Sequence, residues 1–201
     1  MNQLDGGKKS RIAILASGRG SNADAICEYF KDHDLIEVAI IMSNREEAGV
    51  KNVAIEHHVP FKWHSNQDFK KGIPVLETLR RYQVHYIVLA GFLRKIPDEI
   101  IKSYSRRILN IHPALLPNYG GKGMYGQNVH KAVKSSGDKE TGITIHFVNQ
   151  EYDKGRVIFQ SSCQIDPEDS PEDIAKKVQK LEHKYFPKVI ESVIESGRST
   201  N

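Results

Sequence analysis

Short apolar runs rich in β-branched residues alternate with segments of helical periodicity, and this alternation constrains the fold of the chain more than any other feature. The first run, residues 11–16, leads through a glycine-containing loop into a helical pattern that reaches Phe30. Comparable strand-like runs follow at residues 36–42, 86–90, 108–111, 143–148 and 157–161. Strands that alternate with helices are typical of a mostly parallel sheet with helices on both faces. We therefore expect an α/β fold built on one open sheet.

The chain contains no feature that would divide it into several domains. Its 201 residues, 39% of them hydrophobic, are enough for one substantial core, and there is no internal repeat, low-complexity tract or flexible linker. We expect one domain, residues 11–197, with a Rossmann-like open sheet, between a flexible N-terminal tail (1–10) and a C-terminal tail (198–201). The last helix is predicted to begin at Ser170, which can cap it, with Pro171 at the first helical position.

Charge and cysteine content narrow the range of partners. The 29 basic and 25 acidic residues are interspersed and leave a formal net charge of +4, which suits a small anionic ligand better than a nucleic-acid duplex. Cys27 and Cys163 form no Cys-x-x-Cys pair, so neither a disulfide framework nor a metal site is indicated. The start of the chain lacks the apolar stretch of a signal peptide, and other apolar runs are of strand length. We expect a soluble, cytoplasmic protein that binds neither nucleic acid nor membrane.

The first strand-to-helix turn contains Gly18, Gly20, Ser21 and Asn22. Free backbone N–H groups and the positive helix end attract anions at such a position, and glycine lets the main chain approach a phosphate closely. The turn lacks the third glycine of a dinucleotide fingerprint and the Gly-Lys-Ser/Thr of a P-loop, so a simple phosphate ester fits better than a dinucleotide or ATP. A structural turn in which Ser or Asn only caps the helix is the alternative that stays open.

Asn110 and His112 close a strand-like run immediately before Pro113. Side chains two positions apart in a strand point to the same side, so both can face one ligand. Pro113 cannot continue the strand ladder, which places the imidazole at the carboxyl edge of the sheet, where open α/β folds bind ligands. An amide and an imidazole together can stabilise a developing oxyanion. A structural histidine beside a turn is the alternative reading.

A polar loop containing Asp153 and Gly155 separates the last two strand-like runs, in a hairpin-like position. Asp153 is a candidate carboxylate to orient His112 and to favour its protonated form. The alternative is a turn residue ahead of Gly155. His146 lies inside the preceding run, where an inward-facing histidine is more often packed and hydrogen-bonded than chemical.

Four motifs stand in order along the chain: Ser-Gly-Arg-Gly-Ser-Asn at 17–22, Leu-Ala-Gly-Phe at 89–92, Asn-Ile-His-Pro-Ala-Leu-Leu-Pro at 110–117 and Asp-Lys-Gly at 153–155. Together they resemble the phosphoribosylglycinamide formyltransferase family of folate-dependent enzymes. The resemblance extends from Arg11 to about Gly197 and implies that residues 11–197 form a formyltransferase domain. Two departures, Arg156 in place of a common proline and a glycine-rich stretch at 120–126, concern loop geometry rather than the catalytic residues.

The resemblance implies a reaction with two substrates. A formyl group passes from the cosubstrate 10-formyltetrahydrofolate to the amine of glycinamide ribonucleotide, which gives the N-formyl product and tetrahydrofolate in de novo purine (IMP) biosynthesis. Asn110 and a protonated His112 would stabilise the tetrahedral oxyanion, while Asp153 would keep His112 charged and position a water that carries the proton. No metal is required. The enzyme would work as a monomer or a homodimer.

The resemblance also implies binding residues. Main-chain groups after the Leu-Ala-Gly-Phe motif would contact the pterin, and residues 149–153 would close that pocket. Lys70 stands where relatives often carry an arginine that binds the glutamate tail of the folate. A lysine keeps the positive charge at this position but cannot form the two parallel hydrogen bonds of a guanidinium group. The residues implied for the ribonucleotide are Gly20, Ser21, Asn22 and Glu182, the last of which looks from its sequence context alone like a solvated helix residue. Those implied for folate are Lys70, Leu93, Arg94, Lys95, Ile96 and Asn110.

Other functions are compatible with parts of this pattern. Formyl transferases acting on methionyl-tRNA or a sugar amine, and formyltetrahydrofolate hydrolases, carry a further domain, for which a chain of 201 residues leaves little room. A nucleotide-binding module without catalysis would keep the phosphate loop and use Asn110 and His112 structurally. Tetrahydrofolate release that depends on the amine separates the transferase from both the hydrolase and the binding module.

Overall fold

Strand β1 (Ser10–Leu15) is the third strand of a seven-stranded sheet in the computed structural model, which describes residues 9–198. The strand order is β3-β2-β1-β4-β5-β6-β7, in which the pairs from β3 to β5 are parallel and the pairs β5–β6 and β6–β7 are antiparallel. The expected α/β fold with a mostly parallel sheet is confirmed, and its antiparallel edge makes the sheet mixed. The other strands are β2 (Ile36–Ser43), β3 (Phe61–Trp63), β4 (Tyr86–Leu89), β5 (Ile108–His112), β6 (Glu140–Phe147) and β7 (Val157–Gln164).

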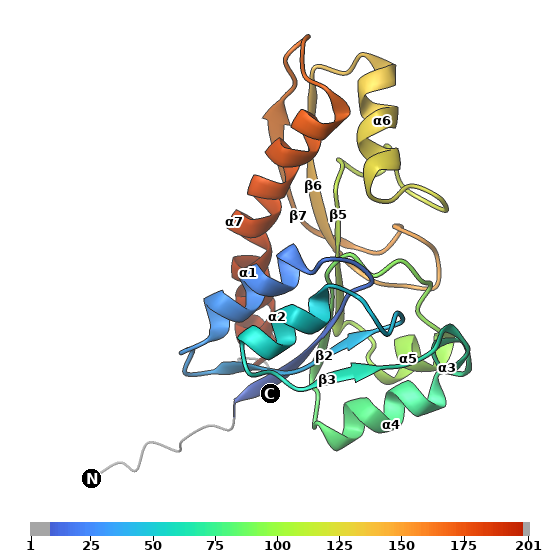
Figure 1. Cartoon of the computed structure of the whole chain (residues 1–201), viewed down its shortest axis with the longest axis vertical. Coiled ribbons are helices and arrows are strands. Elements are labelled where there is room, and N and C mark those ends of the chain that lie inside the picture. Colours follow the sequence, from blue (N-terminus) through green and yellow to red (C-terminus); the bar gives the residue numbers. More distant parts are fainter. Residues whose placement is uncertain (1–8, 199–201) are drawn as a thin grey trace.

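The side chains of β1 alternate between two hydrophobic cores, one on each face of the sheet. Ile12 and Ile14 belong to the core beneath α1, α2 and α7, whereas Ala13 and Leu15 belong to the core beneath α3, α4 and α5. All four side chains are fully buried. Helices therefore cover both faces, as expected (Figure 1). These helices are α1 (Ser21–Phe30), α2 (Val50–Glu56), α3 (Asn66–Lys71), α4 (Ile73–Arg81), α5 (Asp98–Ser103) and α7 (Pro171–Arg198).

The start of α7 is capped as the sequence predicts. The backbone N–H of Asp173 donates to the Ser170 hydroxyl across 3.2 Å, and the backbone N–H of Ser170 donates to the Asp173 carboxylate across 3.3 Å. Such a reciprocal cap typically stabilises a helix by about 1 kcal/mol. Ile174, Val178 and Ile190 then face the core, which fixes the rotation of the helix and hence the direction of its polar residues.

Helix α6 (Gln127–Ser136) follows the glycine-containing loop after β5 and stands away from the two main cores. Its Val129 and Val133 are fully buried with Ala114 in a third, small hydrophobic cluster, against which Tyr119 packs. Helix α6 packs against α7, and Lys134 near its end donates to the Pro167 carbonyl, just before α7, across 2.7 Å. This small cluster anchors the loop that connects β5 to α6.

The structure differs from the sequence expectations at the ends and at one edge. Strand β3 has only three residues, too few to display a period, and the sequence did not indicate it. Ser10 and Arg198, assigned to the two tails, instead begin β1 and end α7. The rest of the tails, residues 1–8 and 199–201, lies outside the described residues. Within residues 9–198, no helix is both long and apolar enough to cross a membrane.

The topology brings several chain segments to one edge of the sheet. The parallel strands β1, β4 and β5 end there, and β5 ends at His112. The antiparallel β6 pairs Asn110 with His146, so the connection from β6 to β7 returns to the same place. Side chains from distant parts of the sequence therefore meet beyond the carboxyl ends of the parallel strands.

Candidate active site

An open cavity of about 840 Å³ lies beyond the carboxyl ends of β4 and β5 and is lined on other sides by α6, α7 and the turn before α1. A recess of about 80 Å³ adjoins it under the connection between β6 and β7. Asn110 and Asp153 line both spaces, and His112 lines the larger one. The predicted catalytic residues therefore stand at the junction of the two spaces.

Asn110 faces the junction because β5 is extended and its alternate side chains point to one side. Its Nδ2 lies 3.1 Å from Nε2 of His146, the residue opposite it on β6. The Nδ1 atom of His146 lies 2.9 Å from the carbonyl oxygen of Phe147, which can only accept, so Nδ1 carries the hydrogen. In the neutral ring Nε2 then accepts from Asn110. This contact sets the orientation of the Asn110 amide toward the cavity.

His112 is only 3% exposed and has an acceptor near each ring nitrogen. Its Nε2 donates to the backbone carbonyl of Tyr119 across 2.7 Å, and its Nδ1 lies 3.7 Å from Oδ2 of Asp153. Burial lowers the pKa of the His112 imidazole, and the opposing effects of the Asp153 carboxylate and the Tyr119 carbonyl do not offset it. Asp153 thus acts in the expected direction, but burial outweighs it, and the hydrogen on Nε2 is directed at the Tyr119 carbonyl.

Asp153 is half-buried in the connection between β6 and β7, at φ +54°. Its Oδ2 accepts from the backbone N–H of Gly121 across 2.9 Å, and its Oδ1 lies 3.7 Å from Nε2 of His146. Burial raises the pKa of this carboxyl, but the interactions with His146, the Gly121 N–H and His112 together bring it below its ordinary value. Asp153 is therefore ionised and faces two imidazole rings.

The structure brings Asn110, His112 and Asp153 together, as the sequence predicts, and adds residues that the sequence did not single out. His146 contacts both Asn110 and Asp153, although its strand position alone favours a packed residue. Tyr119 contributes a main-chain carbonyl, which leaves no trace in the sequence. The register between β5 and β6, which places His146 opposite Asn110, is the one signal that identifies it.

The turn before α1 has the features of an anion site. Gly20 precedes the helix at φ +90°, and no side chain caps the first turn. The first intrahelical bond runs from Asp24 N–H to the Gly20 carbonyl, so the backbone N–H groups of residues 21–23 have no partner within the helix. Asn22 and Arg19 line the cavity, while the Ser21 hydroxyl accepts from Gln179 of α7 across 3.0 Å. This arrangement suits a phosphate group at the helix end.

Glu182 of α7 reaches the same end of the cavity. Nδ2 of Asn22 donates to its Oε2 across 2.9 Å, and both side chains line the cavity. Burial raises the pKa of the Glu182 carboxyl against the effect of this hydrogen bond. The structure therefore places Glu182 in the wall of the cavity, in contrast to the solvated helix position that its sequence context suggests.

The segment after β4 lies between the two spaces. Leu93 and Arg94 line the larger cavity, and Arg94, Lys95 and Ile96 line the recess together with residues 149–153. The backbone N–H of Leu93 is engaged with the Ser17 hydroxyl at 2.9 Å. Lys70, by contrast, is exposed on α3 and lines neither space. Its assignment to a folate tail stays a prediction.

Neither cysteine lines the cavity or the recess. Cys27 is buried, Cys163 is half-buried, and both are free thiols. Among residues 9–198, no group of three or more His, Cys, Asp or Glu side chains is arranged to hold a metal ion.

The sequence profile of formyl transferases matches residues 10–190 of the chain, a range that contains the Asn22–Glu182 pair and the group around His112. The chain belongs to the formyl transferase family. This family member is 39% identical over 194 residues to the chloroplastic phosphoribosylglycinamide formyltransferase of Arabidopsis thaliana, with 94% of this chain and 66% of the relative covered. It is 34% identical over 191 residues to the phosphoribosylglycinamide formyltransferase of Bacillus subtilis strain 168, with 92% and 94% covered.

Solved structures agree with the family assignment. The crystal structure of phosphoribosylglycinamide formyltransferase from Anaplasma phagocytophilum superposes with a TM-score of 0.86 at 29% identity, covering 94% of this chain and 89% of that one. This family member spans 66% of the length of the plant relative and 94% of the bacterial one. The sequence similarity therefore extends over nearly all of the bacterial relative.

Proposed function

We propose that this formyl transferase moves the formyl group of 10-formyltetrahydrofolate onto the amine of glycinamide ribonucleotide, in de novo purine biosynthesis. The observation that carries the proposal is the position of Asn110, His112 and Asp153 at the junction of two spaces of different character. One space begins at an uncapped helix end, which suits a phosphorylated substrate. The other lies under residues 149–153, beside an apolar strand end. The names of the plant and bacterial relatives support the same reaction.

The larger cavity is proposed to hold the ribonucleotide. Its phosphate would accept hydrogen bonds from the free N–H groups at the start of α1, near Gly20, Ser21 and Asn22, with Arg19 adding positive charge. Glu182 would accept hydrogen bonds from the sugar hydroxyls, because a half-buried carboxylate beside an amide offers acceptors and no donor of its own. The amine would then point along the cavity toward His112.

The recess is proposed to hold the pterin ring of the folate. Main-chain groups of residues 93–96 would bind its polar edge, and residues 149–153 would cover it. A recess of about 80 Å³ accommodates a bicyclic ring only if that covering connection moves outward, so we expect it to adjust when the folate binds. The formyl group would lie beside Asn110.

The proposed transfer conserves atoms and charge, and it moves one proton from the substrate amine to the folate nitrogen. The amine nitrogen bonds to the formyl carbon, and the formyl oxygen becomes an oxyanion that accepts a hydrogen bond from Asn110 Nδ2. His112 Nδ1 takes the amine proton, because its Nε2–H is already donated to Tyr119. The resulting imidazolium has an acceptor at each nitrogen, the Tyr119 carbonyl and the Asp153 carboxylate. The carbon–nitrogen bond to the folate then breaks, and that nitrogen receives the proton.

A single assay tests the proposal. The purified protein is mixed with 10-formyltetrahydrofolate, with and without glycinamide ribonucleotide, and tetrahydrofolate and the N-formyl product are both measured. The proposal expects both products to appear in equal amounts and only when the amine is present. Tetrahydrofolate with free formate in the absence of the amine would indicate a hydrolase, and no turnover with bound nucleotide would indicate a binding module. Activity with a different amine would mean that the protein transfers formyl groups but uses another acceptor than glycinamide ribonucleotide.

The cellular location and the assembly state are also proposals. Two free thiols favour a reducing compartment such as the cytoplasm. We expect the enzyme to work as a monomer or a homodimer. Cell fractionation and sedimentation of the purified protein test these two points.

A further inference from the structure

Ser17 lies just after β1, between the ends of two neighbouring strands. Because β1 pairs with β2 on one side and with β4 on the other, the residues that follow these three strands come together at the carboxyl edge of the sheet. Asn44 follows β2, and Leu93 lies shortly after β4. Ser17 and Asn44 are almost fully buried, at 1% and 5% exposed. Buried polar side chains normally have hydrogen-bond partners, so their contacts show which segments they hold together.

Ser17 and Asn44 belong to a chain of hydrogen bonds that ends on the main chain of Leu93. The backbone N–H of Leu93 donates to the Ser17 hydroxyl oxygen across 2.9 Å, and that hydroxyl donates to Oδ1 of Asn44 across 2.6 Å. Nδ2 of Asn44 donates in turn to Oδ1 of Asn66, the first residue of α3, across 2.9 Å. We call Ser17, Asn44 and Asn66 the strand-end relay. It connects α3 to the segment after β4 through the end of β1.

The hydrogen bonds of the strand-end relay all run in one direction. A backbone N–H can only donate, so the Ser17 oxygen accepts from Leu93 and its own hydrogen is directed at Asn44. Asn44 therefore presents its oxygen to Ser17 and its NH₂ group to Asn66. Each member fixes the orientation of the next. Removing Ser17 or Asn44 leaves a buried partner without its hydrogen bond.

The main chain of residues 92–96 has few other restraints. These residues belong to neither a helix nor a strand, and within residues 9–198 the bond to Ser17 is the only hydrogen bond of their main chain. The side chains of Phe92 and Ile96 are buried in the core beneath α3, α4 and α5, whereas residues 93–95 between them are exposed. The bond from Leu93 to Ser17 therefore positions the exposed part of the segment.

The same exposed part contributes to both spaces of the candidate active site. Leu93 and Arg94 line the larger cavity, and Arg94 and Lys95 line the recess proposed for the pterin. No member of the strand-end relay lines either space. Binding is tighter when the groups that contact a ligand are already held in the bound geometry. The position of this main chain should therefore affect folate affinity.

We propose that the strand-end relay positions the main chain of residues 93–95 for folate binding, without itself touching either substrate. Ser17 and Asn44 are positioning residues, and Asn66 is the exposed end of the relay. This inference rests on the proposed function for the identity of the ligand. Hydrogen exchange of the Leu93 amide, in contrast, reports on the relay without any ligand.

The test uses buried and exposed variants of the full chain. Ser17→Ala removes the acceptor of the Leu93 N–H, and Asn44→Ala removes the group that orients the Ser17 hydroxyl. Asn66→Ala breaks the relay at an exposed residue, whereas Asn66→Asp keeps an oxygen that accepts from Asn44. The measurements are hydrogen exchange of the Leu93 amide, kcat, the KM of both substrates, and the Kd of tetrahydrofolate by anaerobic calorimetry.

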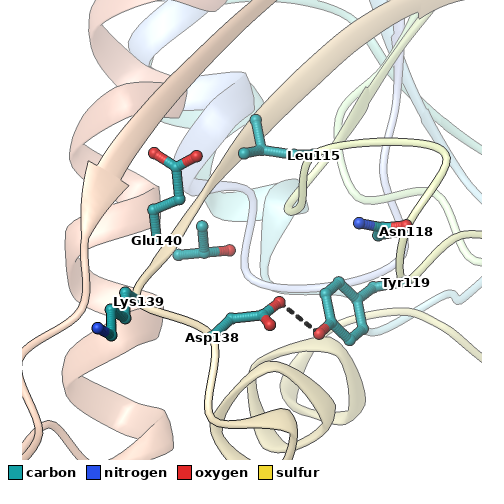
Figure 2. Close-up of a pocket in the computed structure, with 7 residues that line it drawn as sticks. Leu115, Asn118, Tyr119, Asp138, Lys139 and Glu140 are labelled. Atoms are coloured by element: carbon teal, nitrogen blue, oxygen red, sulfur yellow. Dashed lines mark hydrogen bonds between the residues drawn. The ribbon is translucent and has the colours of Figure 1, made fainter.

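Two controls separate the strand-end relay from general damage to the fold. Ser43→Ala removes another fully buried hydroxyl, at the end of β2, whose partner is the backbone N–H of Arg45 at 3.1 Å. Asp138→Ala breaks a hydrogen bond outside the relay. Figure 2 shows Asp138 joined to the Tyr119 hydroxyl, beside a cavity of about 270 Å³ that no relay residue lines. Neither control should change the Kd of tetrahydrofolate.

Ser17→Ala should raise the KM for 10-formyltetrahydrofolate and the Kd of tetrahydrofolate by about three- to tenfold, the usual effect of losing one hydrogen bond. The kcat and the KM for glycinamide ribonucleotide should not change, because binding is lost equally in the ground state and the transition state. The Leu93 amide should exchange faster with solvent, since its hydrogen bond is gone.

The other variants test whether the residues act as one relay. Asn44→Ala should act in the same direction as Ser17→Ala, and the double variant should bind tetrahydrofolate no more weakly than Ser17→Ala alone, since both changes break the same relay. Asn66→Ala should raise the Kd by a smaller factor, because water can replace a partner at an exposed residue. Asn66→Asp should bind like the wild type.

Three results would overturn the inference. One is a Ser17→Ala protein whose Leu93 exchange and tetrahydrofolate Kd are both unchanged. Another is a Ser43→Ala protein that binds tetrahydrofolate as weakly as Ser17→Ala. If the buried variants do not fold, equal Kd values for Asn66→Ala and Asn66→Asp are the third. A wild-type protein that binds no tetrahydrofolate would refute the proposed function instead, and the Leu93 exchange would still decide the positioning role.

Discussion

The side-chain amide of Asn22 donates a hydrogen bond to the Glu182 carboxylate across 2.9 Å, which joins the first turn of α1 to the middle of α7 over 160 residues of sequence. Both side chains line the larger cavity, and the Asn22 Oδ1 atom is buried with no hydrogen-bond partner in the described part of the chain. An unsatisfied buried acceptor beside a carboxylate is a place where ligand hydroxyl groups gain hydrogen bonds. This pair is therefore the expected sugar-binding corner of the site.

Replacing Glu182 tests this corner. Glu182→Ala should raise KM for glycinamide ribonucleotide by about tenfold, because a hydrogen bond to a charged group contributes about 1.5–3 kcal/mol. The KM for 10-formyltetrahydrofolate should not change, since Glu182 lines only the larger cavity. Lys180→Ala, an exposed change on the same helix, is the control. A rise in the folate KM instead would place the ribonucleotide elsewhere.

Changes at His112 and Asp153 test the catalytic pair. His112→Ala and Asp153→Asn should each lower kcat by about a hundredfold or more, the usual effect of removing a group that stabilises the transition state. Asparagine is the informative replacement at 153, because it tolerates φ +54° and so removes the charge without straining the backbone. Combining the two changes should add little, since the residues act as a unit.

Matched controls for this pair are available on the surface. His58→Asn keeps a residue that accepts the φ of +54° at an exposed position, and Asp34→Asn removes an exposed carboxylate. Both should transfer formyl groups at the wild-type rate. Near wild-type activity of folded His112→Ala and Asp153→Asn would contradict the catalytic assignment.

The pH dependence follows from the buried imidazole. Burial holds the pKa of His112 below its ordinary value of 6.5, so below pH 6.5 the unfolded chain binds a proton at this ring before the native state does. The contribution of this ring to the free energy of unfolding therefore has its full value above pH 6.5. It decreases as the pH falls from 6.5 toward the pKa of the His112 ring in the folded protein. The pKa of Asp153 lies below its ordinary value of 3.8, so this carboxylate stays ionised around pH 6.5.

Two measurements check this prediction. The His112 ring should titrate with a midpoint below pH 6.5 in an NMR titration of the free protein. The kcat/KM for glycinamide ribonucleotide should fall with the same midpoint on the acid side, because the proposed proton acceptor is the neutral ring. A midpoint above 6.5 would contradict the lowered pKa that burial gives this ring.

Gly20 and Gly18 form a matched pair for the phosphate turn. Alanine at 20 meets a φ of +90° and would place its Cβ 2.7 Å from Cγ2 of Val50, whereas alanine at 18 meets no atom within 4 Å. Gly20→Ala should lower the free energy of unfolding by about 1–3 kcal/mol and weaken binding of the ribonucleotide phosphate. Gly18→Ala should change neither, as measured by denaturant unfolding and by KM. Equal effects of both changes would show that the positive φ of Gly20 and its close contact with Val50 do not cause the loss of stability and binding.

Local periodicity accounts for the parts of this protein that its sequence predicts. The order of strands and helices, the Ser170 cap and the common direction of Asn110 and His112 all follow from neighbours within a few residues. The start of α1 after Gly20 also follows from neighbouring residues. The three-residue strand β3 escaped prediction because a period needs more residues than it contains.

The completed site depends on contacts between segments that are far apart in the chain. Sheet pairing decides that His146 lies opposite Asn110, and the path of the loop after β5 decides that the Tyr119 carbonyl reaches His112. The packing of α7 against α1 turns Glu182 from an apparent surface residue into a cavity residue. The amino-acid sequence thus determines the elements and the chemical groups at their ends, because those depend on short-range sterics and periodicity. Only the tertiary structure decides the partners and protonation of those groups, because burial and long-range pairing set them.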